Sequence, residues 1–260
     1  MRNVLRELLD AGDAALGTWV TLTDPAVVEL AAIAGFDFVA IDLEHSAIGL
    51  ETLQHHLRAA EARGLGTLVR VPSAEPKGLL RVLDSGPGGV LAPGIRGAGD
   101  AAAAVAACRY PPAGERGMSS LSRAAAYGGH GLGGLPELAA ALDRSVVVGL
   151  MIEEAEAVDA IEDVLAVPGL DLACVGPTDL SASLGALGEP GDARVAAAVE
   201  RVLAACGDAG VPFAMPAGNA AYPLTAAELR RRGASLITVM TDAALLAAGM
   251  RAAVADAGDA

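Results

Sequence analysis

Two acidic side chains stand directly after apolar runs of this sequence. Glu153 follows a run at 146–152, and Asp179 lies in the Gly-Pro-Thr-Asp turn at 176–179, after a second run at 170–175. Both runs have the length and β-branched content of buried strands, and the ends of neighbouring parallel strands meet at one edge of a sheet. Two hard oxygen ligands on that edge predict a site for a divalent cation.

Two more predicted strand ends deliver groups that can stabilise charge and move protons. One strand ends in Ile-Asp-Leu-Glu-His at 41–45, and the next ends at Arg70. Arg70 would face a developing enolate oxygen as a fixed cation. His45, oriented by Asp42 or by Glu44, would transfer a proton.

The small number of acidic ligands narrows the chemistry. A magnesium or manganese ion held by two carboxylates keeps several positions for water or substrate. A 2-oxo acid can chelate such an ion through its keto and carboxylate oxygens, which polarises the carbonyl and acidifies the adjacent C–H. The turn at 176–179 opens a short helix, and its free N–H groups, from Gly176 and Thr178, would hold the substrate carboxylate. These residues together predict enolate chemistry on a 2-oxo acid.

The elements that must position these side chains repeat along the whole chain. Each apolar run is followed by a segment with helical spacing, and Asp24 with Pro25 at one helix start and Thr225 with Glu228 at another give helix-start signals. Eight strands each followed by a helix predict a (β/α)8 TIM barrel, an α/β fold, as one domain over residues 1–260. An open doubly wound sheet is the alternative, because a sequence does not show closure. The predicted strands are 17–22, 36–43, 67–71, 90–92, 146–152, 170–175, 211–215 and 235–240.

One connection departs from this pattern. Residues 109–136 are rich in Gly, Pro and Ser, and such a long connection without a core of its own is typical of a lid or binding loop. The connection contains Gly129, Gly131 and Gly134 in a GxGxxG spacing, but no strand precedes them, so NAD is not expected.

Composition excludes several classes of partner. The 260 residues carry a formal charge of -14, which would repel nucleic acid and anionic membranes. No apolar run reaches the roughly 18 residues of a membrane span, and acids interrupt the N-terminal segment, so we expect a cytoplasmic protein. Cys108, Cys174 and Cys206 stand singly and are expected to be buried apolar residues.

Basic and imidazole side chains outside the predicted site have simpler explanations. The single lysine, Lys77, lies at a predicted helix start on the solvent side, so neither a Schiff base nor PLP is expected. His55 and His56 lie inside a predicted helix whose leucines point elsewhere, and we expect both in solvent. Structural roles also exist for the site residues, because Glu153 and Asp179 could cap helices and Arg70 could pair with a carboxylate.

The ordered set of motifs resembles the metal-dependent, class II pyruvate aldolases of the 4-hydroxy-2-oxoheptanedioate aldolase group, the HpcH/HpaI family. This resemblance covers nearly the whole chain, and the set is far more specific than any one motif. The matching pieces are GTW at 17–19, AGFDFVAIDLEHS at 34–46, LVRVP at 68–72, RYPPAGERG at 109–117, IE at 152–153 and GPTDLSASLG at 176–185.

The resemblance implies a (β/α)8 barrel of the phosphoenolpyruvate/pyruvate type with a Mg²⁺, Mn²⁺ or Co²⁺ ion on Glu153 and Asp179. It also implies that Arg70 stabilises a pyruvate enolate, that His45 supported by Asp42 transfers protons, and that Trp19 contacts substrate. It further implies a homohexamer, a trimer of dimers that exchange their last helix, in which neighbouring subunits complete each site.

One position departs from the family pattern. The family usually has a glutamine two residues before the metal-binding glutamate, and this chain has Met151 there. A thioether donates no hydrogen bond, so the surroundings of the metal and substrate differ.

The leading hypothesis is a lyase that reversibly cleaves a 4-hydroxy-2-oxo acid to pyruvate, or a related 2-oxo acid, and an aldehyde. The alternatives are a citryl-CoA-like thioester lyase or an oxaloacetate decarboxylase on the same site. A third is a catalytically weakened 2-oxo-acid-binding protein, which Met151 motivates.

Overall fold

Eight parallel strands close into a barrel in the computed structural model, which describes residues 2–258. Each strand pairs with the next, and β8 returns to pair with β1, with Leu16 opposite Ile237. This closure confirms the (β/α)8 prediction and excludes the open sheet. The strands are β1 Ala15–Val20, β2 Phe38–Asp42, β3 Gly66–Arg70, β4 Gly89–Ala92, β5 Val147–Ile152, β6 Leu172–Val175, β7 Phe213–Ala217 and β8 Leu236–Thr241.

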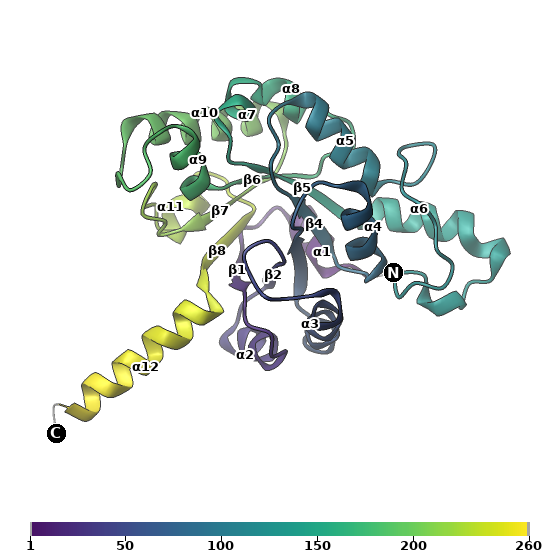
Figure 1. Cartoon of the computed structure of the whole chain (residues 1–260), viewed down its shortest axis with the longest axis horizontal. Coiled ribbons are helices and arrows are strands. Elements are labelled where there is room, and N and C mark those ends of the chain that lie inside the picture. Colours follow the sequence, from purple (N-terminus) through teal and green to yellow (C-terminus); the bar gives the residue numbers. More distant parts are fainter. Residues whose placement is uncertain (1, 259–260) are drawn as a thin grey trace.

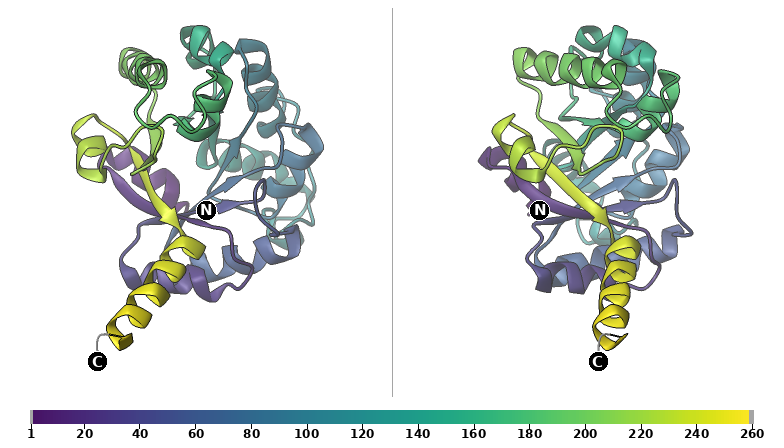
Figure 2. Two further views of the ribbon diagram at one scale, coloured as in Figure 1. Left: turned by 60° about the vertical axis from the view of Figure 1, so that its left-hand side comes forward. Right: turned by 90° about the vertical axis from the view of Figure 1, so that its left-hand side faces the viewer.

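Helices surround the barrel on its outer side, as Figures 1 and 2 show. The predicted capping box is present, because the Thr225 side chain accepts from the Glu228 N–H while the Glu228 carboxylate accepts from the Thr225 N–H. The helices are α1 Val4–Ala11, α2 Ala26–Ala34, α3 Leu50–Arg63, α4 Pro76–Asp84, α5 Ala98–Cys108, α6 Leu135–Ser145, α7 Ala155–Asp159, α8 Ile161–Leu165, α9 Pro177–Ser183, α10 Ala193–Ala209, α11 Ala226–Arg231 and α12 Asp242–Gly258. Between β5 and β6 the single predicted helix is two short ones, because Ala160 leaves helical geometry at φ -101° and ψ 21°.

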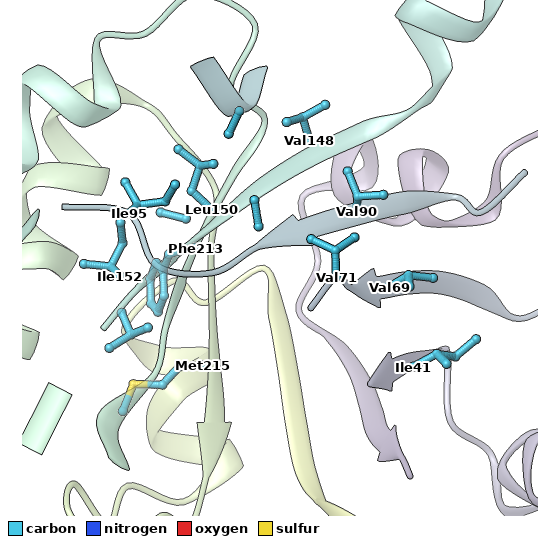
Figure 3. Packing of buried hydrophobic residues seen from close by; sticks show 14 of the residues in the cluster. Ile41, Val69, Val71, Val90, Ile95, Val148, Leu150, Ile152, Phe213 and Met215 are labelled. Atoms are coloured by element: carbon cyan, nitrogen blue, oxygen red, sulfur yellow. The ribbon is translucent and has the colours of Figure 1, made fainter. Parts of the chain in front are cut away.

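The core has two apolar layers, because successive strand residues point to opposite faces. Figure 3 shows the layer between strands and helices, with Ile41, Val69, Val90 and Val148 among its members. A second, smaller cluster fills the barrel interior and includes Phe38, Leu68, Leu91, Met151, Cys174 and Leu236. Filling both layers makes the strands rigid supports for the side chains at their ends.

Helix α1, which the sequence analysis did not predict, lies at the N-terminal end of the barrel. Leu5 is fully buried in the interior cluster. Asn3 caps the helix and donates from Nδ2 to the carbonyl oxygens of Gly88 and Ser145, both at 2.7 Å. This end of the barrel is therefore covered by the chain itself, and the carboxyl ends of the strands lie at the opposite end.

The connection at 109–136 lies at the N-terminal end of the barrel, which makes the expectation of a lid over this chain's own site wrong. It follows the C-terminus of α5, and its Arg116 and Arg123 bind the residues that end α4. The Arg116 Nη2 donates to Asp84 Oδ1 at 3.1 Å, and the Arg123 Nη1 donates to the Ser85 carbonyl oxygen at 2.9 Å. The connection therefore packs on the turn between α4 and β4, at the end of the barrel where the strands begin.

The predicted burial of the cysteines and the predicted exposure of Lys77 are confirmed, but one of the two histidine predictions is wrong. All three cysteines are free and buried, and Lys77 is exposed. His55 is exposed, whereas His56 is fully buried. The ring nitrogens of His56 lie 2.8 Å from the Thr52 carbonyl oxygen and 3.1 Å from the Leu22 carbonyl oxygen. The imidazole is buried because it links α3 to the β1–α2 connection, a tertiary contact that helical spacing does not reveal.

Among residues 2–258, no helix is both long enough and apolar enough to cross a membrane.

Candidate active site

The predicted site residues gather at the carboxyl end of the barrel. Asp42 is the last residue of β2, Arg70 is the last of β3, and Glu153 follows β5 directly. Asp179 lies in the first turn of α9, after β6. A cavity of about 400 Å³ is lined by Asp42, Arg70, Asp179 and Trp19 among others. The fold therefore brings together groups that are far apart in the sequence.

A second cavity adjoins the first through Asp179. It has a volume of about 450 Å³, and its lining includes Glu44, His45, Glu153 and Asp179. The sequence predicted the meeting of all four side chains. It did not predict that the buried Glu153 carboxylate faces the imidazole side of the site while Arg70 faces the other cavity.

Arg70 and Asp42 form a buried bidentate ion pair. The guanidinium donates from Nε to Asp42 Oδ1 at 3.0 Å and from Nη2 to Oδ2 at 2.7 Å. Burial alone would raise the pKa of Asp42, but the hydrogen bonds and charge of Arg70 outweigh it and hold that pKa below its usual range. The guanidinium carbon also lies 4.7 Å from the centre of the Trp19 ring. Trp19 and Asp42 together fix the plane of the guanidinium.

The surroundings of His45 differ from the prediction. Asp42 does not contact the imidazole, because its carboxylate binds Arg70 and accepts from the backbone N–H groups of Glu44 and His45. The nearest acid is Glu44, whose Oε2 lies 3.7 Å from His45 Nε2. Burial raises the pKa of Glu44. The His45 side chain is 60% exposed, so it can exchange protons with solvent.

Glu153 has one satisfied and one free carboxylate oxygen. Its Oε1 accepts from the Gly94 N–H at 3.0 Å, whereas its buried Oε2 has no hydrogen-bond partner among the described residues. Burial raises the pKa of Glu153, and the neighbouring charges of Glu44 and Asp179 raise it further. A buried anionic oxygen without a donor is costly, and a cation is the partner that removes the cost.

Gly176 leaves the space beside that free oxygen. A Cβ on Gly176 would lie 2.8 Å from the Met151 Cε and 3.1 Å from the Glu153 Oε2. Its backbone N–H, however, donates to the Ile152 carbonyl oxygen at 3.1 Å. The expectation that this N–H is free for a substrate is therefore wrong, because the N–H is bound to the last residue of β5. No side chain caps α9, which leaves the Thr178 N–H at an open helix end.

The donor set fits a hard divalent cation that keeps open coordination positions. Within residues 2–258, no group of three or more His, Cys, Asp or Glu side chains is arranged to hold a metal. Two carboxylates, one with a buried unpartnered oxygen beside the small Gly176, match an ion that also binds water or substrate. A closed structural site with soft ligands does not match this set.

Three residues that were not predicted also contribute to the site. Gly94 holds Glu153 in place, Asn219 donates from Nδ2 to Thr178 Oγ1 at 2.9 Å, and Cys174 lines the first cavity. Gly94 and Asn219 follow β4 and β7, so their positions after strand ends were the available signal. Burial raises the pKa of Cys174 to about 12, which makes this thiol an apolar wall of the cavity.

Comparisons with known proteins agree with this geometry. Residues 15–247 match the family model described as HpcH/HpaI aldolase/citrate lyase. A pyruvate aldolase of Rhizobium etli is 35% identical over 253 residues, which cover 97% of this chain and 96% of the relative. A 4-hydroxy-2-oxo-heptane-1,7-dioate aldolase of Salmonella typhimurium is 34% identical over 259 residues, which cover 99% and 95%.

A solved structure extends the agreement to the fold. The crystal structure of an HpcH/HpaI aldolase/citrate lyase family protein from Burkholderia cenocepacia J2315 superposes with a TM-score of 0.89 at 36% identity. The superposition covers 98% of this chain and 99% of that one. The chain belongs to the HpcH/HpaI aldolase/citrate lyase family.

Proposed function

We propose that this protein is a metal-dependent aldolase that reversibly cleaves a 4-hydroxy-2-oxo acid into pyruvate, or a related 2-oxo acid, and an aldehyde. The observation that carries the proposal is the buried, unpartnered Oε2 of Glu153 beside Asp179, at the carboxyl end of a barrel that also presents Arg70. Relatives that share about a third of the sequence over nearly its whole length are named aldolases.

Glu153 and Asp179 would hold the cation, as Mg²⁺, Mn²⁺ or Co²⁺. When bound, such an ion supplies a Lewis acid that polarises the substrate carbonyl. The free Oε2 of Glu153 and the space beside Gly176 support these two ligands.

The positively charged guanidinium of Arg70 would stabilise the negative charge on the enolate oxygen. In the cleavage direction the 4-hydroxyl loses its proton, the C3–C4 bond breaks to release the aldehyde, and its electron pair forms the enolate of the 2-oxo acid. A guanidinium locked by Asp42 and stacked on Trp19 needs no rearrangement to stabilise that charge. Pyruvate is complete when C3 takes up a proton.

His45 carries protons between the reacting atoms and solvent. Its exposed imidazole lies near the Glu44 carboxylate and lines the same cavity as Glu153. The Thr178 N–H, at the open end of α9, is a donor for the substrate carboxylate. Met151 lines the first cavity where the family usually has glutamine, so this donor is replaced by an apolar contact.

Two other readings stay open within this proposal. Citryl-CoA-like cleavage or oxaloacetate decarboxylation would use the same enolate, and the family description includes citrate lyase. A CoA thioester needs basic side chains to bind the phosphates of its CoA part. The described lining of the first cavity has one basic side chain, Arg70, which Asp42 already binds. Met151 is the motive for the remaining reading, a weakened 2-oxo-acid-binding protein.

We also propose that the protein is a homohexamer in which dimers exchange α12. Asp242 is the one buried residue of this helix, and Figure 1 shows the helix projecting away from the barrel. Leu246, Met250 and Val254 repeat at helical spacing and are 52%, 60% and 74% exposed. An apolar stripe of this kind is typical of a helix that packs on another chain. A cytoplasmic location stays part of the proposal.

Exchange of the pyruvate methyl protons in heavy water tests the enzymatic proposal. The protein is incubated with pyruvate and with magnesium, manganese or cobalt, and the methyl signal is followed by NMR. We expect exchange that requires the metal and is lost in Glu153→Gln, but retained in Glu162→Gln, a control on α8 whose side chain is 64% exposed. Exchange that persists under chelation contradicts the metal, and pyruvate binding without exchange favours the non-catalytic reading.

A further inference from the structure

The Gly176 N–H, one of the two donors predicted for the substrate carboxylate, is bound within the protein. It donates to the Ile152 carbonyl oxygen at 3.1 Å, and the next residue, Pro177, has no N–H. Thr178 differs from both, because its side chain carries a hydroxyl in addition to its backbone N–H. The donors that reach the substrate therefore depend on how the Thr178 hydroxyl is oriented.

Asn219 determines that orientation. The Asn219 Nδ2 donates to Thr178 Oγ1 at 2.9 Å, while its Oδ1 accepts from the Ala221 N–H at 2.9 Å. Turning the amide round would lose the hydrogen bond to Ala221, so the amide nitrogen is fixed on the side of Thr178. Because an amide nitrogen donates and does not accept, the Thr178 oxygen is the acceptor of this pair. The hydroxyl proton is left for another acceptor.

The loop that carries Asn219 is closed on itself and anchored to α10. The Gly218 N–H donates to the Leu224 carbonyl oxygen at 2.7 Å, and the Tyr222 N–H donates to the Asn219 carbonyl oxygen at 3.1 Å. The Tyr222 side chain is buried, and its hydroxyl donates to Glu200 on α10. The Asn219 amide is therefore held in place without a substrate.

Thr178 and Asn219 both line the first cavity, together with Arg70 and Asp179. A hydroxyl that donates to an ionised carboxylate forms a charge-assisted hydrogen bond, which is stronger than a bond between neutral groups. The contact between Thr178 and Asn219 lies within one chain, so a neighbouring subunit is not needed to form it.

We infer that Asn219 is a positioning residue for the 2-oxo acid, which directs the Thr178 hydroxyl proton to the substrate carboxylate. The inference rests on the proposed aldolase function and deepens it, because it names the pair of side chains that selects the carboxylate of the substrate.

Pyruvate affinity and turnover together test this role. The full chain is saturated with manganese, the Kd for pyruvate is measured by calorimetry, and the saturated rate of methyl-proton exchange gives kcat. We expect Asn219→Ala and Thr178→Val each to raise Kd by about tenfold, the loss of one charge-assisted hydrogen bond, while kcat changes by less than about threefold. Thr178→Ser keeps the hydroxyl, so its Kd should stay within about threefold of the wild-type value.

Asn219→Asp reverses the direction of the hydrogen bond. Its carboxylate still accepts from the Ala221 N–H, so the loop keeps that anchor, but it also takes the Thr178 proton and brings a negative charge toward the substrate. We expect Kd to rise by at least about thirtyfold, more than in Asn219→Ala. A purely structural role of Asn219 predicts the opposite order, because aspartate keeps the anchor that alanine loses.

A double variant and a control complete the test. Thr178→Val combined with Asn219→Ala should bind pyruvate no more weakly than the weaker single variant, because both act through one hydrogen bond. Thr225→Ala removes a threonine hydroxyl that caps α11 and lines neither cavity. We expect it to lower Tm and to leave the pyruvate Kd unchanged.

An unchanged Kd in Asn219→Ala, tighter binding by Asn219→Asp than by Asn219→Ala, or additive losses in the double variant overturns the inference. A matching loss of manganese affinity in Asn219→Ala also overturns it. Metal-dependent exchange by the wild-type protein leaves the aldolase function standing in each of these cases. Pyruvate binding without exchange removes that function, and the Kd ratios still decide the role of Asn219. No pyruvate binding by the wild-type protein overturns both.

Discussion

Asp42 and Arg70 stand opposite each other as the last register pair between β2 and β3, and their side chains meet in two parallel hydrogen bonds. The ladder that places the two strands therefore also sets the geometry of the ion pair. Because β2 and β3 are held by apolar layers on both faces, the guanidinium is fixed before substrate arrives. This relationship connects the barrel core to the proposed chemistry.

Substitutions in this ion pair should lower kcat more than they weaken substrate binding. Arg70→Lys keeps a charge but loses the planar fork, and we expect kcat to fall by about 10²- to 10³-fold. Asp42→Asn keeps the shape but weakens the clamp, and we expect a fall of about tenfold. Steady-state kinetics of pyruvate aldol addition measure both effects. An Arg70→Lys enzyme with unchanged kcat would contradict the role of the guanidinium.

The same pair predicts a loss of stability in acid. Arg70 lowers the pKa of Asp42 in the folded protein, so the pair stabilises the fold above the unfolded pKa of Asp, and this contribution disappears as pH falls through the lower folded pKa. At pH 7, Asp42→Asn should reduce the free energy of unfolding by about 3 kcal/mol, because the buried Arg70 loses its closest charge partner and keeps only the longer contact from its Nε to Glu44 Oε2 at 3.4 Å. Denaturant melts of both proteins between pH 7 and pH 3 should show the difference shrinking with acid. A pH-independent difference would disprove this linkage.

Gly176→Ala should damage the proposed metal site without unfolding the barrel. Its Cβ would come within 2.8 Å of the Met151 Cε and 3.1 Å of the Glu153 Oε2, so the carboxylate must move. We expect manganese affinity, measured by calorimetry, to fall at least about tenfold. Gly207→Ala is the matched control, since nothing lies within 4 Å of its added Cβ, and it should stabilise α10 by about 0.5–1 kcal/mol. Equal metal affinity in the two variants would exclude this account of Gly176.

Charges on the apolar stripe of α12 should lower the oligomeric state. Leu246→Asp combined with Met250→Asp places two carboxylates on side chains that are 52% and 60% exposed in the single chain. If α12 packs on a neighbouring chain, burying those charges opposes association, and light scattering should report a smaller particle. Leu187→Asp, on an exposed loop, should leave the mass unchanged. The proposed helix exchange fails if the double variant keeps the wild-type mass.

Much of the fold could be predicted because each strand–helix unit carries its own local signals. The helices Leu50–Arg63 and Ala193–Ala209 each have apolar residues at helical spacing and end at a glycine, so local signals define both. Closure was predicted from the number of strand–helix units and from the family resemblance, and no local signal shows it, because it depends on the pairing of β8 with β1 across more than two hundred residues. Helix α1 was missed for the same reason, since its apolar face is explained only by the barrel end that it covers.

The site was predictable as a set of residues but not as a set of contacts. Position after a strand end placed Asp42, Arg70, Glu153 and Asp179 together, because parallel strands end on one face. The sequence did not show which acid lies beside His45. Asp42 binds Arg70 and not the imidazole, because the register between β2 and β3 places Asp42 opposite Arg70. The burial of His56 likewise depended on a carbonyl oxygen of another connection.

A crystal grown with manganese and oxalate, a planar mimic of the pyruvate enolate, would show whether Glu153 and Asp179 hold a metal ion together. We expect one manganese ion bound by the free Oε2 of Glu153, by a carboxylate oxygen of Asp179 and by two oxalate oxygens, with the Arg70 guanidinium against the oxalate. Glu153 and Asp179 pointing apart, with no ion between them, would contradict it.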